Sequence, residues 1–446
     1  MNSNEKLRGL LALSPLAVFM LAYLLTSAVV GDFDKVPVSS TFLLASIYAV
    51  IISRNPLGKG AGFGASLDAK LEIFSSGAGN KTLLQMVWIF VLAGAFAQTA
   101  KDIGSIEATV NLTLRIISPR VLYAGLFVTA CFISMAIGTS IGTIVALVPL
   151  ASGIASQLGA DVAFLTAIVV GGAFFGDNLS FISDTTIAAT KAMECRMNEK
   201  FKANLDICAP AFILVTIIYI FNGAGIGVVP IAGSVNWILI MPYLLVLVLA
   251  LCGVNVALTL TLGIILNLII GLANGTIGWA SWLSSVGSGI GGMGDLIIVT
   301  MLAGGMMEVI RYNGGLEYLI NRLTFLAKGR RGAEACIALL VSLTNLCTAN
   351  NTIAIITTGS MARDIADRFN VDRRRVAGLM DTFSCAVQGL LPYGAQLLMA
   401  SGMAGVGVFP IIGKLYYPMA LGAMAILSII FQLPTRYTGK KNLIRG

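Results

Sequence analysis

The sequence contains no histidine, and charged residues make up only 11% of its 446 residues. Without histidine the chain cannot use Ser-His-Asp or Cys-His catalysis, an HExxH zinc site or a histidine pH switch. Any proton transfer near neutral pH must therefore involve carboxylates. Charge is entirely missing between Ile207 and Gly294, a run of 88 residues. Because one spanning helix needs about 20 apolar residues, the composition predicts a polytopic membrane protein.

Cysteine and short enzyme motifs add no chemistry to this picture. The seven cysteines are scattered without a CxxC pair, which is typical of small buried residues rather than of disulfides or a metal site. GTSIG (138–142) matches GxSxG but has no histidine base, and GSGIGG (287–292) matches GxGxxG in an expected outer loop without a preceding strand. We expect no enzyme activity and no cofactor. The net charge of +8 is attributed to basic loops that set membrane orientation, so no nucleic-acid partner is expected.

Two long apolar segments, 121–160 and 334–362, are interrupted by small polar stretches, GTSIGT (138–143) and CTANNT (347–352). Each could be one full crossing or a re-entrant hairpin. Two hairpins leave 24 of the 29 Lys and Arg residues on the inner side, whereas two full crossings leave 15. The positive-inside rule therefore favours hairpins, with both termini cytoplasmic in the inner cell membrane. The predicted fold class is all-α and polytopic, with about ten transmembrane helices plus two re-entrant hairpins. The predicted spans are 10–30, 37–53, 82–100, 162–180, 205–222, 236–252, 254–273, 295–312, 375–396 and 411–433.

The two halves of the chain resemble each other. LAGAFAQTAKDIGSIE (92–107) aligns with LAGGMMEVIRYNGGLE (302–317) at an offset of 210, and ASQLGAD (155–161) aligns with ADRFNVD (366–372) at 211. Five spans and one hairpin per half place the second copy upside down relative to the first. The sequence thus predicts two inverted repeats, 1–222 and 236–446, joined by an uncharged linker, 223–235. Inverted repeats are typical of secondary transporters that bind substrate near the midplane.

Two aspartates follow an apolar run in FFGDNLSFISDTT (174–186), where a charge inside the bilayer is costly. Asp177, Ser180 and Asp184 are spaced i, i+3, i+7, which predicts one helical face, and unwinding near Asp177 would free carbonyls for sodium. A buried carboxylate binds either a proton or a cation, and this competition is the minimal mechanism of exchange. We expect sodium to bind through Asp177 and Asp184; alternatively, Asp184 is solvated at the helix end near Lys191. The predicted cation and proton ligands are Asp177, Asp184, Asn178, Ser180, Ser183 and Thr185.

The second copy supplies its own polar set. Gln388 aligns with Asp177 and Gln98 aligns with Glu308, so each carboxylate in one copy matches an amide in the other. Glu308 could instead form a salt bridge with Arg311 at i+3. The two polar tips would point helix N-termini at an anionic group, or their side chains would only satisfy the broken backbone. The predicted second-repeat residues are Asp381, Glu308, Gln388, Asn350, Asn351 and Thr352, and those of the first tip are Thr139, Ser140 and Thr143.

The stretch FGDNLSFISDTT closely resembles the signature of the NhaC family of sodium/proton antiporters, which reads like G-D-x-L-S-P-x-S-D-T-T. Phe181 departs from it, standing where the family usually has proline, and could narrow the site or line a pocket for an organic substrate. The matching residues are Gly176, Asp177, Leu179, Ser180, Ser183, Asp184, Thr185 and Thr186. The resemblance implies exchange of Na⁺ for H⁺, and related members are thought to move organic acids or amino acids.

These observations predict a secondary active transporter in the lipid bilayer, namely a sodium/proton antiporter that works by alternating access. The alternative within transport is a sodium- or proton-coupled carrier of a small organic anion or amino acid. A channel is the third hypothesis, and it is disfavoured because the acids cluster near helix breaks in an inverted frame rather than along a continuous polar path. The oligomeric state stays open between a monomer and a homodimer.

Overall fold

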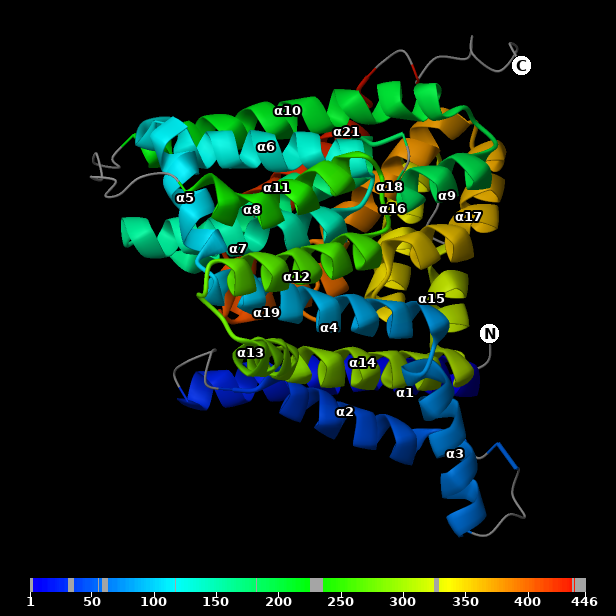
Figure 1. Ribbon diagram of the computed structural model, residues 1–446. Helices are drawn as coiled ribbons and strands as arrows, with labels where there is room; N and C mark the ends of the chain where they lie inside the picture. The colour runs from blue at the N-terminus through cyan, green and yellow to red at the C-terminus, as the bar shows by residue number, and fades with distance from the viewer. Residues whose placement is uncertain are drawn as a thin grey trace.

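The computed structural model describes residues 3–30, 36–54, 56–57, 63–116, 118–181, 183–224, 236–324, 329–434 and 437. Regular secondary structure within these residues is entirely helical (Figure 1). The predicted linker at 223–235 lies almost wholly outside the described residues. The helices are α1 (Ser3–Val30), α2 (Val38–Ile52), α3 (Phe63–Ala78), α4 (Lys81–Asp102), α5 (Ser105–Ile116), the 3₁₀ turn η1 (Pro119–Val121), α6 (Leu122–Ile137), α7 (Ser140–Leu158), α8 (Val162–Leu179), α9 (Asp184–Met193), α10 (Met197–Gly223), α11 (Trp237–Leu251), α12 (Val256–Ala273), α13 (Trp279–Gly292), α14 (Gly294–Tyr312), α15 (Gly315–Thr324), α16 (Gly329–Thr348), α17 (Asn351–Arg368), α18 (Arg373–Gln388), α19 (Ala395–Ala404), α20 (Val408–Ile412) and α21 (Tyr416–Phe431).

The described helices confirm a polytopic membrane protein. Seven stretches are long and apolar enough to cross a bilayer, and five shorter apolar helices accompany them. α8 is apolar on all sides, and every residue from Leu165 to Leu179 is buried, as expected of a helix enclosed by protein. By contrast, α1, α2, α11 and α12 expose leucine and isoleucine side chains, such as Leu25, Ile51 and Leu258. We assign these outer faces to lipid.

The segment 121–160 forms a hairpin. Tyr123 packs edge-on against Phe164, so α6 and α8 start at the same level. Just after the end of α6, the Ser140 N–H donates to the carboxylate of Asp177 in the last turn of α8, so the two helices run in the same direction. α7 then returns and is joined to the start of α8 by only three residues. Gly138 makes the turn with φ 75°, a left-handed conformation that suits glycine.

The second interrupted segment repeats this geometry. Glu334 in the first turns of α16 pairs with Arg375 at the start of α18, and at the other end Gln388 donates to the carbonyl of Ala349 at 3.1 Å. α17 turns back between them. Ala349 occupies the position of Gly138 at the offset of 211, and it too has a positive φ, 50°. Both interrupted segments are therefore re-entrant hairpins, which reach the centre from opposite ends of the molecule in Figure 1.

α10 shows how the two copies are oriented. Lys200 near its start contacts Asn178 at the end of α8, and Tyr219 near its end packs on Phe164 at the start of α8. α10 and α8 are therefore antiparallel.

The same helix runs parallel to α18. Glu199 lies 3.8 Å from Arg374 at the start of α18, and further along both helices Asn204 lies 3.5 Å from Asp381. Since α10 is antiparallel to α8 and parallel to α18, these matching helices of the two copies run in opposite directions. The predicted inversion is thus present in the hairpin-containing parts of the halves.

Helices α3, α4, α13 and α14 pack in two matching crossings. α4 approaches α13 so closely that a Cβ added at Gly94 would overlap the carbonyl oxygen of Gly289. α14 crosses α3 in the same way, with Gly304 against Gly77. Small residues let helix backbones approach closely in membranes. Gly94 and Gly304 are 210 positions apart, so the repeat relates the two crossings. Each crossing joins one helix of the first copy to one helix of the second.

Two predictions about local structure are wrong. GSGIGG (287–292), expected in an outer loop, lies in α13, where Gly289 serves the crossing with α4 rather than a turn. The residues Asp177, Ser180 and Asp184 do not share one helical face. α8 ends at Leu179, and a new helix, α9, begins at Asp184.

Candidate ion-binding site

A cavity of about 420 Å³, which we call the central cavity, lies where the two hairpin tips meet the ends of α8 and α18 and one face of α4. Such a volume would hold an ion with water or a small organic molecule. Nine of the fifteen predicted site residues line it. They are Asp177, Asp184, Thr185, Thr139, Ser140, Asn350, Asn351, Thr352 and Gln388.

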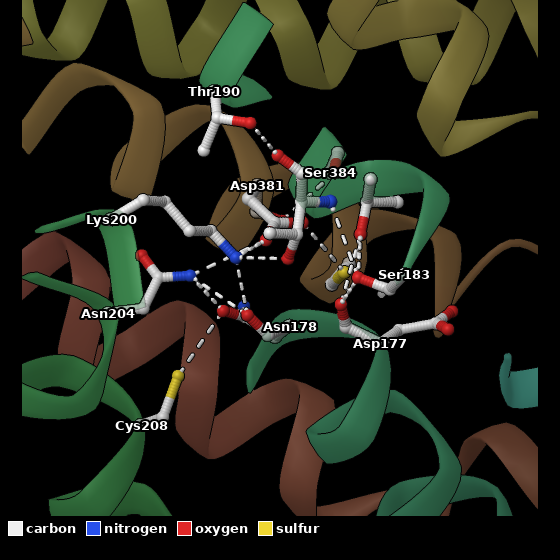
Figure 2. Close-up of polar contacts among 12 residues, drawn as sticks. Asp177, Asn178, Ser183, Thr190, Lys200, Asn204, Cys208, Asp381 and Ser384 are labelled. Carbon is white, nitrogen blue, oxygen red and sulfur yellow. Dashed lines mark hydrogen bonds and ion pairs between the residues drawn. The ribbon is translucent and has the colours of Figure 1, made fainter. Parts of the chain in front are cut away.

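Asp177 is the most enclosed acid of the central cavity. It lies in the last turn of α8 with 6% of its surface exposed, and its Oδ1 accepts the Ser140 N–H at 2.9 Å. Ser140 opens α7, so the carboxylate faces the positive end of that helix. In Figure 2 its side chain points away from Lys200 and Asp381. The Asp177 carboxylate thus faces the cavity as a hydrogen-bond acceptor, and the described contacts give it no basic side-chain partner.

The break after α8 is stabilised by hydroxyl groups. The main-chain carbonyl of Asp177 accepts hydrogen bonds from Ser183 Oγ at 2.7 Å and Thr185 Oγ1 at 3.0 Å. Ser183 also caps the N-terminus of α9, where Asp184 is the first residue and exposed to the cavity. The unwinding predicted near Asp177 therefore occurs just after it, since α8 ends at Leu179 and α9 begins at Asp184. The main-chain carbonyl of Asp177 is already paired with hydroxyl groups.

Six predicted site residues do not line the central cavity. Ser180 donates to the carbonyl of Met135 at 2.9 Å, and Thr143 donates to the carbonyl of Thr139, the residue before the start of α7. Glu308 pairs with Arg311 at 3.5 Å, as its structural alternative predicted. Ser183 acts as the cap just described. The others, Asn178 and Asp381, belong to a buried network behind the cavity wall.

That network is centred on Lys200 (Figure 2), and the Lys200 side chain is 1% exposed. Lys200 forms an ion pair with Asp381 and donates to the carbonyl of Asn178 at 2.6 Å and to Thr186 Oγ1 at 2.7 Å. Asn204 donates to Asn178 Oδ1 from the next turn of α10. The positive-inside argument counted Lys200 as a surface charge, and this is wrong because α10 begins at Met197, eight residues before the expected span.

The second copy contributes amides in place of carboxylates. Gln388, at the repeat position of Asp177, donates to Gln396 Oε1 at 3.0 Å, and Gln396 donates to Ser140 Oγ at 3.1 Å. This chain connects the two copies across the cavity. Gln388 Oε1 accepts no hydrogen bond from any described residue, although it is buried, so it can serve a bound species.

Several lining residues were not predicted from the sequence. α4 contributes Thr82 and Gln85, and Gln396 lies on α19. Gln396 could have been found, since it falls on Thr185 at the offset of 211. Phe181 does not line the cavity: its ring is exposed and stacks on Phe201, with centroids 4.5 Å apart. The hypothesis that Phe181 narrows the site is therefore wrong.

The electrostatic character of the central cavity is acidic. Asp177 and Asp184 line it, and among the residues that the structure describes no lysine or arginine does so. The remaining polar groups are hydroxyl and amide side chains. Oxygen-rich sites with anionic groups suit hard cations, and the lining of the central cavity has this composition.

Two further cavities flank the centre. The α14 cavity, of about 120 Å³, contains Glu308 and Arg311 and shares Thr82, Met86, Ala349, Asn350 and Ile353 with the central cavity. The α13 cavity, of about 450 Å³, contains Gln98 and Lys101. At the offset of 210 these two residues match Glu308 and Arg311 of the α14 cavity. The two flanking cavities therefore match under the repeat, and only the α14 cavity adjoins the site.

Comparison with known proteins places the chain among transporters. The model of the Na⁺/H⁺ antiporter family matches residues 72–224 and 225–433. The chain is 24% identical over 400 residues to Na⁺/H⁺ antiporter NhaC of Bacillus subtilis, covering 79% of this chain and 83% of the relative. It is 24% identical over 399 residues to the Malate-2H⁺/Na⁺-lactate antiporter of the same organism, covering 80% and 82%. The solved YdaH transporter of Alcanivorax borkumensis aligns with 88% of this chain and 97% of its own, with 13% identity and a TM-score of 0.41.

Proposed function

Since the chain belongs to the Na⁺/H⁺ antiporter family, we propose that it exchanges Na⁺ for H⁺ at the central cavity, with Asp177 as the group that both ions use. The observation that carries this proposal is a central cavity lined by two carboxylates and by hydroxyl and amide oxygens. The resemblance of residues 174–186 to the NhaC signature is in accord with this family.

Exchange at Asp177 follows from competition. A proton and Na⁺ both need the carboxylate oxygens, and a bound proton removes the charge that attracts the cation. The N-terminus of α7 keeps the deprotonated carboxylate oriented through the Ser140 N–H. Asp184 adds a second negative charge at the cavity wall, and Gln388 adds a neutral oxygen acceptor. Release of one ion therefore prepares the site for the other.

Alternating access is supported by the inverted frame. The α14 cavity adjoins the central cavity, so access is from the side of α14, α15 and α16. The α13 cavity is its repeat-related counterpart near the opposite helix ends, between α4, α7, α13 and α19. A movement of the hairpin-containing parts relative to α4 and α14 would exchange the roles of the two cavities.

We assign the open side to the cytoplasm. Basic residues at the α9, α16, α17 and α18 ends, such as Lys191, Arg331, Arg363 and Arg373, gather on this side, as the positive-inside rule requires. This orientation would place both termini in the cytoplasm. The repeat boundaries 1–222 and 236–446 belong to the same proposal, and the division of the family match at 224/225 supports them.

The test is transport by the purified protein in proteoliposomes. A Na⁺ pulse should drive proton movement, detected with a trapped pH dye, and Asp177→Asn should abolish it. Asp295→Asn is the matched control, since Asp295 is an exposed acid in the first turn of α14 and should leave exchange largely intact. Equal loss in both folded variants would remove Asp177 from this role.

A second candidate is exchange of a small organic acid, as in the relative named a Malate-2H⁺/Na⁺-lactate antiporter. The observation that favours it is size, because about 420 Å³ is more than a bare ion fills. Asn351 and Thr352 line the cavity at the N-terminus of α17, so the positive end of this helix faces a bound carboxylate. Uptake of radiolabelled carboxylic and amino acids in the same proteoliposomes distinguishes the two candidates.

A further inference from the structure

Lys200 lies in a site that has the composition of a cation site. Its ammonium group has three N–H donors, and three kinds of oxygen surround it: the carboxylate of Asp381, the main-chain carbonyl of Asn178 and the hydroxyl of Thr186 (Figure 2). The carbonyl is available because α8 ends at the next residue. Carboxylate, unwound carbonyl and hydroxyl oxygens are the ligands that transporters use for Na⁺.

This oxygen cage is built from both copies and lies next to the proposed exchange site. Asn178 directly follows Asp177, and Thr186 belongs to the first turn of α9 that also carries Asp184. Asp381 comes from the second copy and is fully buried. The cage therefore occupies the place where a second cation, bound between the copies, would be expected.

The fold of the inverted repeats does not require the ion pair between Lys200 and Asp381. At the offset of 211, the positions that match Asp381 and Lys200 are Val170 and Ile411, both buried apolar residues. A buried ion pair is weak evidence for stability, since apolar residues of similar volume often serve as well or better. The other fully buried pair, Glu334 with Arg375, differs: its guanidinium binds the carboxylate through two nitrogens and also caps the carbonyl of Ser428.

We propose that the Lys200 ammonium is a resident cation that fills a second sodium site formed by Asp381, Asn178 and Thr186. This inference rests on the proposed function, since it assigns one mobile cation to Asp177 and one tethered cation to Asp381. The tethered charge neutralises Asp381 permanently. The protein as it stands therefore binds one Na⁺ per chain, and removal of the lysine side chain opens the cage to a second.

The test is equilibrium binding of radioactive ²²Na⁺ to the purified full-length protein at alkaline pH. The unaltered protein should bind one Na⁺ per chain, and Asp177→Asn should bind none. Lys200→Ala should bind twofold more, and the added ion should survive in Lys200→Ala/Asp177→Asn but vanish in Lys200→Ala/Asp381→Asn. Lys202→Ala, an exposed lysine in the same turn of α10, should bind as the unaltered protein does.

Two results would overturn the inference. One is a Lys200→Ala protein that folds and still binds a single Na⁺. The other concerns proteins that keep Lys200: Na⁺ binding persists in Asp177→Asn and is lost in Asp381→Asn. Sodium would then bind at Asp381 by displacing the lysine. Absence of Asp177-dependent binding in the unaltered protein would refute the proposed function instead, and the Asp381 site would still be measured in Lys200→Ala/Asp177→Asn.

Lys200→Ala leaves Asp381 buried without a counter-charge and can therefore fail to fold without added cation. Thermal unfolding in NaCl against choline chloride keeps the inference testable. Sodium should raise the midpoint of Lys200→Ala more than that of Lys200→Ala/Asp381→Asn, because a ligand that binds only the folded state stabilises it by mass action. Equal shifts in the two variants would contradict a sodium site at Asp381.

Discussion

The crossing of α4 and α13 predicts that Gly289→Ala will destabilise the protein. A Cβ at this position would come closer than 3.0 Å to the Gly94 carbonyl, and the atom it meets is backbone, which cannot rotate away. To restore a normal contact the helices must separate by roughly 1 Å. Gly94 and Gly289 both line the α13 cavity, so the spacing of the two helices also determines the width of that cavity.

The magnitude follows from lost dispersion. Each atom pair at its optimum contributes about 0.1–0.2 kcal/mol, and a gap of this size forfeits a quarter to a half of it. If about 40 pairs are affected, the loss is about 1–4 kcal/mol, which covers the range for overpacked cores. The matched control is Gly291→Ala on the same helix, where nothing lies within 4 Å of the added Cβ. This change should stabilise by up to about 1 kcal/mol, because alanine favours helix over glycine.

The measurement is unfolding of both variants in detergent, followed by circular dichroism with temperature and with increasing SDS. Gly289→Ala should unfold earlier than the unaltered protein, and Gly291→Ala at the same point or later. If Gly289→Ala is as stable as Gly291→Ala, the close approach of α4 and α13 does not exist and the repeat-related crossings lose their support.

Three further predictions concern other parts of the structure. Ala349→Gly should stabilise the protein by about 1 kcal/mol in the same unfolding assay, because Ala349 has φ 50°, where a Cβ is unfavourable; equal or lower stability would contradict a strained second tip. Glu334→Gln should cost about 3–5 kcal/mol, because it leaves Arg375 buried without a counter-charge; a loss below 1 kcal/mol would show that the pair is solvated. A hydrogen bond from Arg373 holds the pKa of Asp367 at the exposed end of α17 below its usual 3.8. The Asp367→Asn variant should therefore be slightly less stable than the unaltered protein at neutral pH, and this difference should disappear as the pH falls through the folded pKa; a difference that persists in acid would exclude this pair as its cause.

The hairpins were predictable because two independent features of the sequence agree. The polar tips at 138–143 and 347–352 interrupt apolar segments, and the Lys and Arg distribution requires each segment to begin and end on one side. The inverted copies followed from the constant offset, which the structure reproduces down to the positive φ angles of Gly138 and Ala349. Membrane proteins allow such inference because charge and polarity inside the bilayer are costly and therefore placed for a reason.

The network around Lys200 was not predictable from the same rules. A hydropathy window treats lysine as a surface residue, and a span was expected to begin only after it. The signal that could have revealed it is the spacing of Lys200, Asn204 and Cys208 at i, i+4 and i+8, a polar stripe that continues into the apolar part of α10. Its partner Asp381 comes from the other copy, and contacts between copies cannot be read from the sequence of either.

The two copies share a fold but differ in their polar residues, and this combination is consistent with what an exchanger requires. Inverted copies let a protein adopt two related arrangements, one open to each side, from similar packing in both. If both copies also carried carboxylates, the closed centre would hold several uncompensated charges, which is costly in a membrane. The protein instead matches Asp177 with Gln388, and Asp381 with the buried Val170, while Lys200 neutralises Asp381. The central cavity then depends on Asp177 and Asp184 for its charge. Under the proposed exchange at Asp177, a bound ion removes one of these two charges before access changes from one side to the other.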